Sequence, residues 1–190
     1  MGFRTVYDYE WSEAGWRMCD RDECEIAAVP LEFIDTAPIR SGDPVTILGA
    51  WMLWYDRHVE EIESPVWGWS TTNDVPDSNH LAGVAVDLNA PRYPWGRLTM
   101  PADRVERVVE GLGLFEGTVF WGRDWSRPDE MHYQLGYREG DPRIAEFAAR
   151  LRAGHLGPYG PEPVPPPAQP GFSPYVAEAF TQLLPNAGRP

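Results

Sequence analysis

The chain has 190 residues, of which 43% are hydrophobic, and it carries a formal charge of −13 at pH 7. Its 16 basic residues are all arginine and stand against 29 Asp and Glu residues. A protein that binds a phosphate backbone needs a concentrated cationic surface, so we expect no nucleic-acid partner. The same balance argues against an anionic membrane surface, and no apolar run approaches the roughly 20 residues of a membrane-spanning helix. Residues 1–8 lack the apolar core of a signal peptide, which predicts a protein made in the cytoplasm.

Prolines and apolar spacing divide the chain into three parts. Residues 157–171 are so rich in proline that they can form neither helix nor sheet, and residues 175–184 have the spacing of a short helix. We therefore expect an N-terminal aromatic and acidic segment over 1–43 that packs on the core. The main domain is expected over 44–155, followed by a Pro-rich linker and a short helix over 156–190. A body of this size suits one core, and we expect a monomer.

Capping residues and apolar periodicity predict a mixture of helices and strands. Helices are expected where a proline opens a run of apolar residues three and four apart: over 44–62, from 99 to Gly111 or Gly113, and over 141–151. Strands are expected where apolar residues run together: over 66–69, 84–88, 118–121 and 131–137. Because these elements do not form a strict βαβ repeat, the sequence predicts an α+β fold with a small, mostly antiparallel sheet flanked by helices.

Cys19 and Cys24 are the two cysteines of the chain. Two thiols without a Cys-x-x-Cys pair are too few for a zinc ribbon. They are either reduced thiols in a loop or a small-loop disulfide that forms in an oxidising compartment.

Two histidines and an aspartate are predicted to be metal ligands. His80 follows a polar loop, and Gly83 allows a tight turn after it. Asp87 ends the next strand among apolar neighbours, where a carboxylate is costly to bury unless it is paired or bound to a cation. His132 begins a later strand. Zinc accepts imidazole and carboxylate ligands, and a catalytic site uses three of them with one open position. The set predicts one Zn²⁺ ion; the alternative is a pair of core histidines and a turn-capping aspartate.

Two sequence motifs resemble those of a known family. Residues 78–87 resemble the S-x-H-x-x-G-x-A-x-D signature of the zinc D-Ala-D-Ala carboxypeptidases and dipeptidases, the VanY/VanX-like family, and residues 129–132 resemble its acidic-x-x-His element. Residues 121–125, W-G-R-D-W, are similar to a W-G-G-D-W segment of phage members that act as L-alanyl-D-glutamate or D-Ala-D-Ala peptidases. The resemblance spans residues 44–138 and implies a Hedgehog/DD-peptidase-like zinc peptidase fold. The lysine-free, Trp- and Arg-rich composition is similar to that of actinobacteriophage endolysins of the lysin A type.

The resemblance also implies roles for the residues around the ligands. The general base of the family stands three positions before the last histidine, which is Asp129 here. Glu130 is the alternative base, because on an extended strand it would face the same side as His132. The family carries an arginine before its first histidine, where this chain has Gly68-Trp69-Ser70. Residues expected to contact substrate are Ser78, Trp125 and, in place of that missing arginine, Arg123.

These assignments imply a zinc-dependent peptidase that hydrolyses peptidoglycan stem peptides during phage-induced host lysis. The bond cleaved would be D-Ala-D-Ala, as in a carboxypeptidase, or L-Ala-D-Glu, as in an endopeptidase. Such an enzyme is made in the host cytoplasm without a signal peptide and acts at the bacterial cell wall after a membrane-permeabilising protein releases it. The alternative, favoured by the missing arginine, is a non-catalytic, metal-containing domain that binds the cell wall. A metal-dependent nuclease is disfavoured by the negative charge.

Overall fold

The computed structural model describes residues 4–160, so the expected helix over 175–184 and most of the Pro-rich linker lie outside the described residues. Helix α1 (Asp43–His58) is buried along most of its length and forms the centre of the core. Its first turn contains Pro44, which suits the start of a helix because its missing N–H has no partner there. The helix ends four residues before the predicted end, and the Asp56 carboxylate accepts a hydrogen bond from the Ile62 backbone N–H in the segment that follows.

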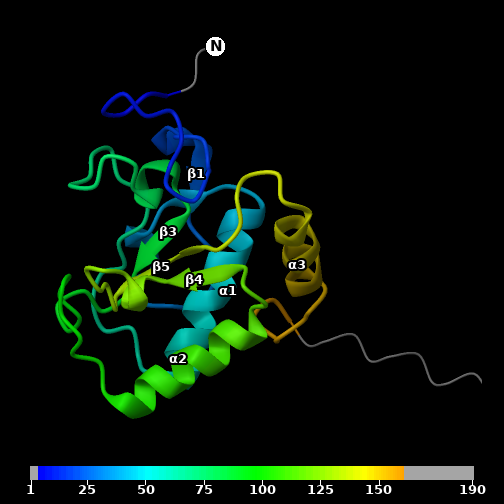
Figure 1. Ribbon diagram of the computed structural model, residues 1–190. Helices are drawn as coiled ribbons and strands as arrows, with labels where there is room; N and C mark the ends of the chain where they lie inside the picture. The colour runs from blue at the N-terminus through cyan, green and yellow to red at the C-terminus, as the bar shows by residue number, and fades with distance from the viewer. Residues whose placement is uncertain (1–3, 161–190) are drawn as a thin grey trace, which may run out of the picture.

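A three-stranded antiparallel sheet lies against α1 (Figure 1). Its strands are β3 (Ala85–Asp87), β5 (His132–Leu135) and β4 (Val119–Trp121), with β5 in the middle. The register of β3 and β5 places Asp87 directly opposite His132. The strand predicted over 66–69 is reduced to a single bridge between Trp67 and Asp87. The predicted α+β class with a small antiparallel sheet is confirmed.

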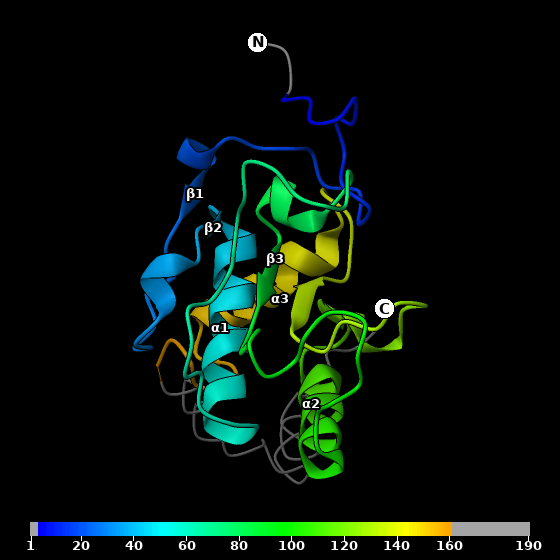
Figure 2. The same cartoon turned by 90° about the vertical axis from the view of Figure 1, so that its left-hand side faces the viewer.

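Helix α2 (Ala102–Leu114) lies at the end of the molecule opposite the N-terminus in both Figures 1 and 2. The prediction that it stops at Gly111 or Gly113 is wrong, since it continues through both. Gly111 is small for a packing reason, because a Cβ atom there would lie 2.2 Å from the ring of Trp54. The chain leaves the helix instead at Glu116 and Gly117, both of which adopt positive φ.

The remaining described elements pack around this centre. Helix α3 (Pro142–Arg152) is capped by the Asp141 carboxylate, as predicted, and packs on α1. The N-terminal segment contains the short pair β1 (Cys24–Glu25) and β2 (Ile39–Arg40). Within residues 4–160, no helix combines the length and apolar character that crossing a bilayer requires.

The two cysteines lie next to each other in the N-terminal segment. Their sulfur atoms are 3.7 Å apart, and both thiols are free and buried. The reduced form is therefore the one that the structure contains.

Candidate metal centre

A short 3-10 helix, η3 (Asn79–Ala82), presents His80 to the sheet. The Ser78 hydroxyl caps it by accepting a hydrogen bond from the His80 backbone N–H at 3.3 Å. Gly83 ends it with φ +68°, and a Cβ atom there would lie 2.9 Å from the Cys24 sulfur and 3.0 Å from the Arg40 nitrogen. Glycine is therefore required on both conformational and steric grounds. This turn folds η3 back over β3, so that His80 faces Asp87.

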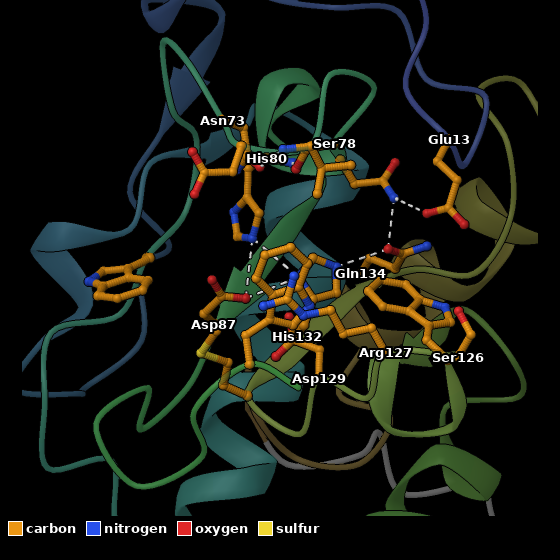
Figure 3. A pocket seen from close by; sticks show the side chains of 17 residues that line it. Glu13, Asn73, Ser78, His80, Asp87, Ser126, Arg127, Asp129, His132 and Gln134 are labelled. Atoms are coloured by element: carbon orange, nitrogen blue, oxygen red, sulfur yellow. Dashed lines mark hydrogen bonds and ion pairs between the residues drawn. The ribbon is translucent and has the colours of Figure 1, made fainter. Parts of the chain in front are cut away.

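Three predicted ligand atoms converge on one point (Figure 3). His80 Nε2 lies 3.2 Å from Asp87 Oδ1 and 3.2 Å from His132 Nδ1, and His132 Nδ1 lies 3.0 Å from Asp87 Oδ1. All three residues are buried, with exposed fractions of 5–7%. The tertiary fold thus brings together residues that the sequence separates by up to 52 positions.

The outer nitrogen of each histidine has its own acceptor. His80 Nδ1 donates to the Gly68 carbonyl at 2.8 Å, and His132 Nε2 donates to the Gln134 side-chain oxygen at 2.9 Å. In a neutral imidazole, this leaves the inner nitrogen with a lone pair and no proton. Two such lone pairs and the Asp87 carboxylate face one another, which is unfavourable unless a proton or a cation lies among them.

The donor set fits zinc. Ligands about 2.0–2.2 Å from a tetrahedral ion lie about 3.3–3.6 Å apart, close to the spacing observed. A second partner on each imidazole is the usual arrangement around a zinc-bound histidine, because it holds the ring and its tautomer. His80, Asp87 and His132 would hold the ion.

The electrostatic interactions among the three residues favour an ionised Asp87 and a positively charged histidine. Burial alone would lower the pKa of His80, but the Asp87 charge and the hydrogen bond to it outweigh burial and raise that pKa above its ordinary value. Burial alone would raise the pKa of Asp87, yet the two histidines hold it well below its usual range. Asp87 is therefore an anion at neutral pH, as a metal ligand must be.

The two acidic residues before His132 point in different directions. Asp129 lines the cavity beside the ligands, and its Oδ1 atom is buried without a hydrogen-bond partner among the described residues. Burial, followed by the nearby Asp87 charge, raises the pKa of Asp129 to about 6. Glu130 turns away, and its carboxylate accepts hydrogen bonds from the backbone N–H groups of Thr99 and Met100, just before α2.

The three predicted ligands lie in the wall of a cavity of about 530 Å³. Three tryptophans line it, Trp67, Trp95 and Trp125, and the Trp125 ring centroid is 5.0 Å from that of His132. Ser78 also lines the cavity, although its hydroxyl caps η3. The cavity is thus bounded by aromatic rings near the ligands and by polar groups around them.

Arg123 and Arg127 lie in different places. Arg123 is not among the cavity-lining residues, and its guanidinium lies near the carboxylates of Asp124 and Glu130. Arg127 is the only arginine that lines the cavity within the described part of the chain. Its guanidinium stacks 3.5 Å from the Trp95 ring centroid, and no ion pair joins it to a carboxylate of residues 4–160.

Sequence reasoning missed Arg127 and two polar neighbours of the predicted ligands, Glu13 and Asn79, and it assigned no role to Gln134. The proximity of Arg127 to the predicted base was a usable signal, because it stands two positions before Asp129. No local signal marks Glu13, which reaches the site from the N-terminal segment.

The comparisons with known proteins identify a related family for part of the chain. A family model described as D-alanyl-D-alanine carboxypeptidase matches residues 71–135, which include all three predicted ligands and both acidic residues. Searches of curated proteins and of solved structures found no match. The family match and the buried His-Asp-His group are together consistent with a metal-dependent peptidase.

Proposed function

We propose that the protein is a zinc-dependent peptidase that hydrolyses peptidoglycan stem peptides. The observation that carries this proposal is the convergence of two imidazole nitrogens and a carboxylate in one cavity, beside Asp129, whose Oδ1 has no hydrogen-bond partner among the described residues. Three protein ligands with an open side are typical of catalytic zinc, whereas structural zinc is enclosed by four. The match to the D-alanyl-D-alanine carboxypeptidase family supports a peptidoglycan-derived substrate.

The reaction adds water across a peptide bond, giving a carboxylate and an amine. Zinc, when bound, supplies a Lewis acid that polarises the carbonyl and makes water more acidic. Asp129 is the proposed general base: it takes a proton from the attacking water and returns it to the leaving nitrogen. Its place in the cavity wall supports this role over that of Glu130, which does not line the cavity and whose Oε2 accepts hydrogen bonds from two backbone N–H groups.

We assign substrate binding to the cavity wall. Arg127, stacked on Trp95 and without an acidic partner among residues 4–160, is suited to a substrate carboxylate, since a guanidinium binds carboxylates through paired hydrogen bonds. Trp125 and the half-exposed Trp67 offer flat apolar surfaces on which a peptide can pack. In this proposal Arg127, and not Arg123, takes the place of the arginine that the family carries before its first histidine.

The biological setting is part of the proposal. The endolysin-like composition and the W-G-R-D-W segment support an enzyme of phage-induced host lysis, made in the host cytoplasm and active at the cell wall after release. Both a D-Ala-D-Ala carboxypeptidase and an L-Ala-D-Glu endopeptidase suit the site, because a cavity of this volume accepts a short peptide.

Mass spectrometry of digested cell wall tests the function and identifies the bond. Purified peptidoglycan is incubated with zinc-loaded protein, with chelator-treated protein and with treated protein to which zinc is returned. The proposal expects new stem-peptide fragments in the first and third samples and none in the second. Fragments lacking the terminal D-Ala indicate the carboxypeptidase, and stems freed between L-Ala and D-Glu indicate the endopeptidase.

The same experiment addresses the non-catalytic alternative. Stoichiometric zinc and retention of the protein on cell walls, without any new fragment, would contradict the peptidase and support a wall-binding domain. The absence of an arginine at residues 68–70, where the family carries one, favours that alternative, and the presence of Arg127 in the cavity weakens it.

A further inference from the structure

Gln134 and His132 lie on the same face of the central strand. Residues two apart on a strand project to the same side, and β5 is held by backbone pairing to both β3 and β4. The Gln134 side-chain oxygen accepts the hydrogen bond from His132 Nε2 at 2.9 Å, which turns His132 Nδ1 toward Asp87 (Figure 3). The direction in which His132 presents a lone pair therefore depends on an amide that itself has to be held in place.

Asn79 holds that amide. Its side-chain nitrogen donates to the same Gln134 oxygen at 2.7 Å, and only 2% of Asn79 is exposed. Asn79 is the neighbour of His80 in η3, whereas Gln134 stands two residues from His132 in β5. A single amide–amide hydrogen bond thus connects the two segments that carry the histidine ligands.

Glu13 is the outermost member of this group. The Asn79 side-chain nitrogen also lies 3.3 Å from a Glu13 carboxylate oxygen. Two hydrogen bonds donated by backbone N–H groups hold the N-terminal segment there. Glu13 N donates to the Asp77 carbonyl at 2.7 Å, and Ala14 N donates to the Asn79 side-chain oxygen at 3.1 Å. Glu13 lies outside residues 71–135, so this contact belongs to a part of the chain that the family model does not match.

We propose that Asn79 and Gln134 are positioning residues that orient His132 and set its spacing from His80, and that Glu13 of the N-terminal segment steadies Asn79. The relay Glu13–Asn79–Gln134 acts through His132 and does not touch the reacting atoms. The proposal rests on the metal centre of the proposed function and does not depend on which peptide bond is cleaved.

Zinc affinity of the full-length protein, measured by competition with a chromogenic chelator, tests the relay. Gln134→Met keeps the side-chain length and removes the acceptor, so zinc should bind about 10- to 100-fold more weakly, the usual cost of losing a partner of a metal-bound histidine. Gln134→Glu retains an acceptor for both His132 and Asn79 and should restore affinity close to that of the unchanged protein. Glu13→Ala, at an exposed position, should weaken zinc binding by about fivefold, as expected for one modest hydrogen bond.

Two further measurements separate positioning from a loss of stability. Thr118→Val removes a different buried hydrogen bond, from its hydroxyl to the Phe115 carbonyl, and should leave zinc affinity unchanged. Asn79→Asp replaces the donor toward Gln134 by an acceptor while keeping the side-chain shape, so it should weaken zinc binding in a protein of the same size and fold. In cadmium-loaded protein with isotope-labelled histidine, NMR coupling to the metal should identify His132 Nδ1 as the ligand atom, and this coupling should weaken in Gln134→Met.

Several outcomes overturn the relay. The relay is contradicted if Gln134→Met and Asn79→Asp fold and bind zinc with unchanged affinity. It is also contradicted if NMR shows that cadmium couples to His132 Nε2. An equal loss of affinity in Thr118→Val would attribute the effect to stability and would also overturn it. These results would not affect the proposed peptidase function if the protein cleaves cell walls. Conversely, if the relay variants behave as expected but the protein cleaves no cell wall, only the proposed function would be contradicted.

Discussion

Two charged clusters, each built around a buried carboxylate, differ in how their charges are compensated. The Glu60 carboxylate receives two tyrosine hydroxyl groups, from Tyr55 and Tyr93, on one oxygen. Its other oxygen contacts the guanidinium groups of Arg92 and Arg104, at 2.9 and 2.6 Å. Every acceptor position of this carboxylate is used by a group of the chain itself. The cluster is complete and serves to join α1, the loop after it and α2.

In the group formed by His80, Asp87 and His132, only the ring nitrogens that point away from the centre have hydrogen-bond acceptors outside the group. Its outer nitrogens have acceptors, but its inner atoms face one another at 3.0–3.2 Å with one carboxylate and, within the described part of the chain, no basic partner other than the imidazoles. Burying such an arrangement is costly unless a proton or a cation neutralises it. Incomplete internal compensation, more than burial or charge alone, thus distinguishes the candidate metal-binding cluster from the structural one.

The largest expected effect is the loss of zinc from Asp87→Ala. Removing the anion leaves two imidazoles, so zinc binding should be abolished and thermal stability should no longer respond to zinc. For the wild-type protein, the free energy of unfolding should increase by about 2.7 kcal/mol at a zinc concentration about 100 times its Kd. Calorimetry with and without a chelator measures this difference. A zinc-dependent stability that survives in Asp87→Ala would show that the metal binds elsewhere.

Asp129→Asn should retain zinc and lose activity. A general base typically contributes about 100- to 10,000-fold, and the loss should appear in kcat. The matched control is Glu130→Gln, which weakens the hydrogen bonds to Thr99 and Met100 and should lower the free energy of unfolding by about 1–2 kcal/mol while activity is kept. Both variants are tested by measuring kcat and KM on a stem peptide and by determining their zinc content. An active Asp129→Asn and an inactive Glu130→Gln would reverse the assignment of the base.

Arg127→Met should weaken the binding of acidic substrates. A hydrogen-bonded charge is worth about 1.5–3 kcal/mol, so kcat/KM for a peptide with a carboxylate near the cleaved bond should fall about 10- to 100-fold, mainly through KM. The corresponding amidated peptide should be affected little. Arg97→Met, exposed in the loop that contains Trp95 and absent from the cavity wall, is the control. If kcat/KM fell equally for both peptides, Arg127 would not recognise the substrate carboxylate.

The smallest effect on activity is expected from Glu60→Gln. Replacing the carboxylate weakens its contacts with two arginines and should lower the free energy of unfolding by about 1–3 kcal/mol, without changing zinc affinity. Urea unfolding and zinc competition measure the two quantities. If Glu60→Gln also weakened zinc binding, the two clusters would be coupled and the contrast between them would no longer hold.

Local signals in the sequence predicted most of the elements that carry the site. Asp-Pro pairs mark the starts of α1 and α3, because proline suits the first turn of a helix. The Asp141 side chain also caps α3, whereas Asp43 lies inside the first turn of α1. The strands predicted over 84–88 and 131–137 contain β3 and β5. The end of α2 was not predictable in the same way, because Gly111 serves a contact with Trp54, which is remote in the sequence.

The sequence by itself determined the three candidate ligands and their order, and it placed His80 and Asp87 on either side of a turn that forms locally. Only the tertiary structure decided which acidic residue faces the cavity, which arginine lines it and which amide holds His132. These outcomes depend on side-chain directions set by distant partners, such as the backbone before α2 for Glu130 and the Trp95 ring for Arg127. Local propensities carry no information about such partners, so directed polar contacts appear only once the chain is folded.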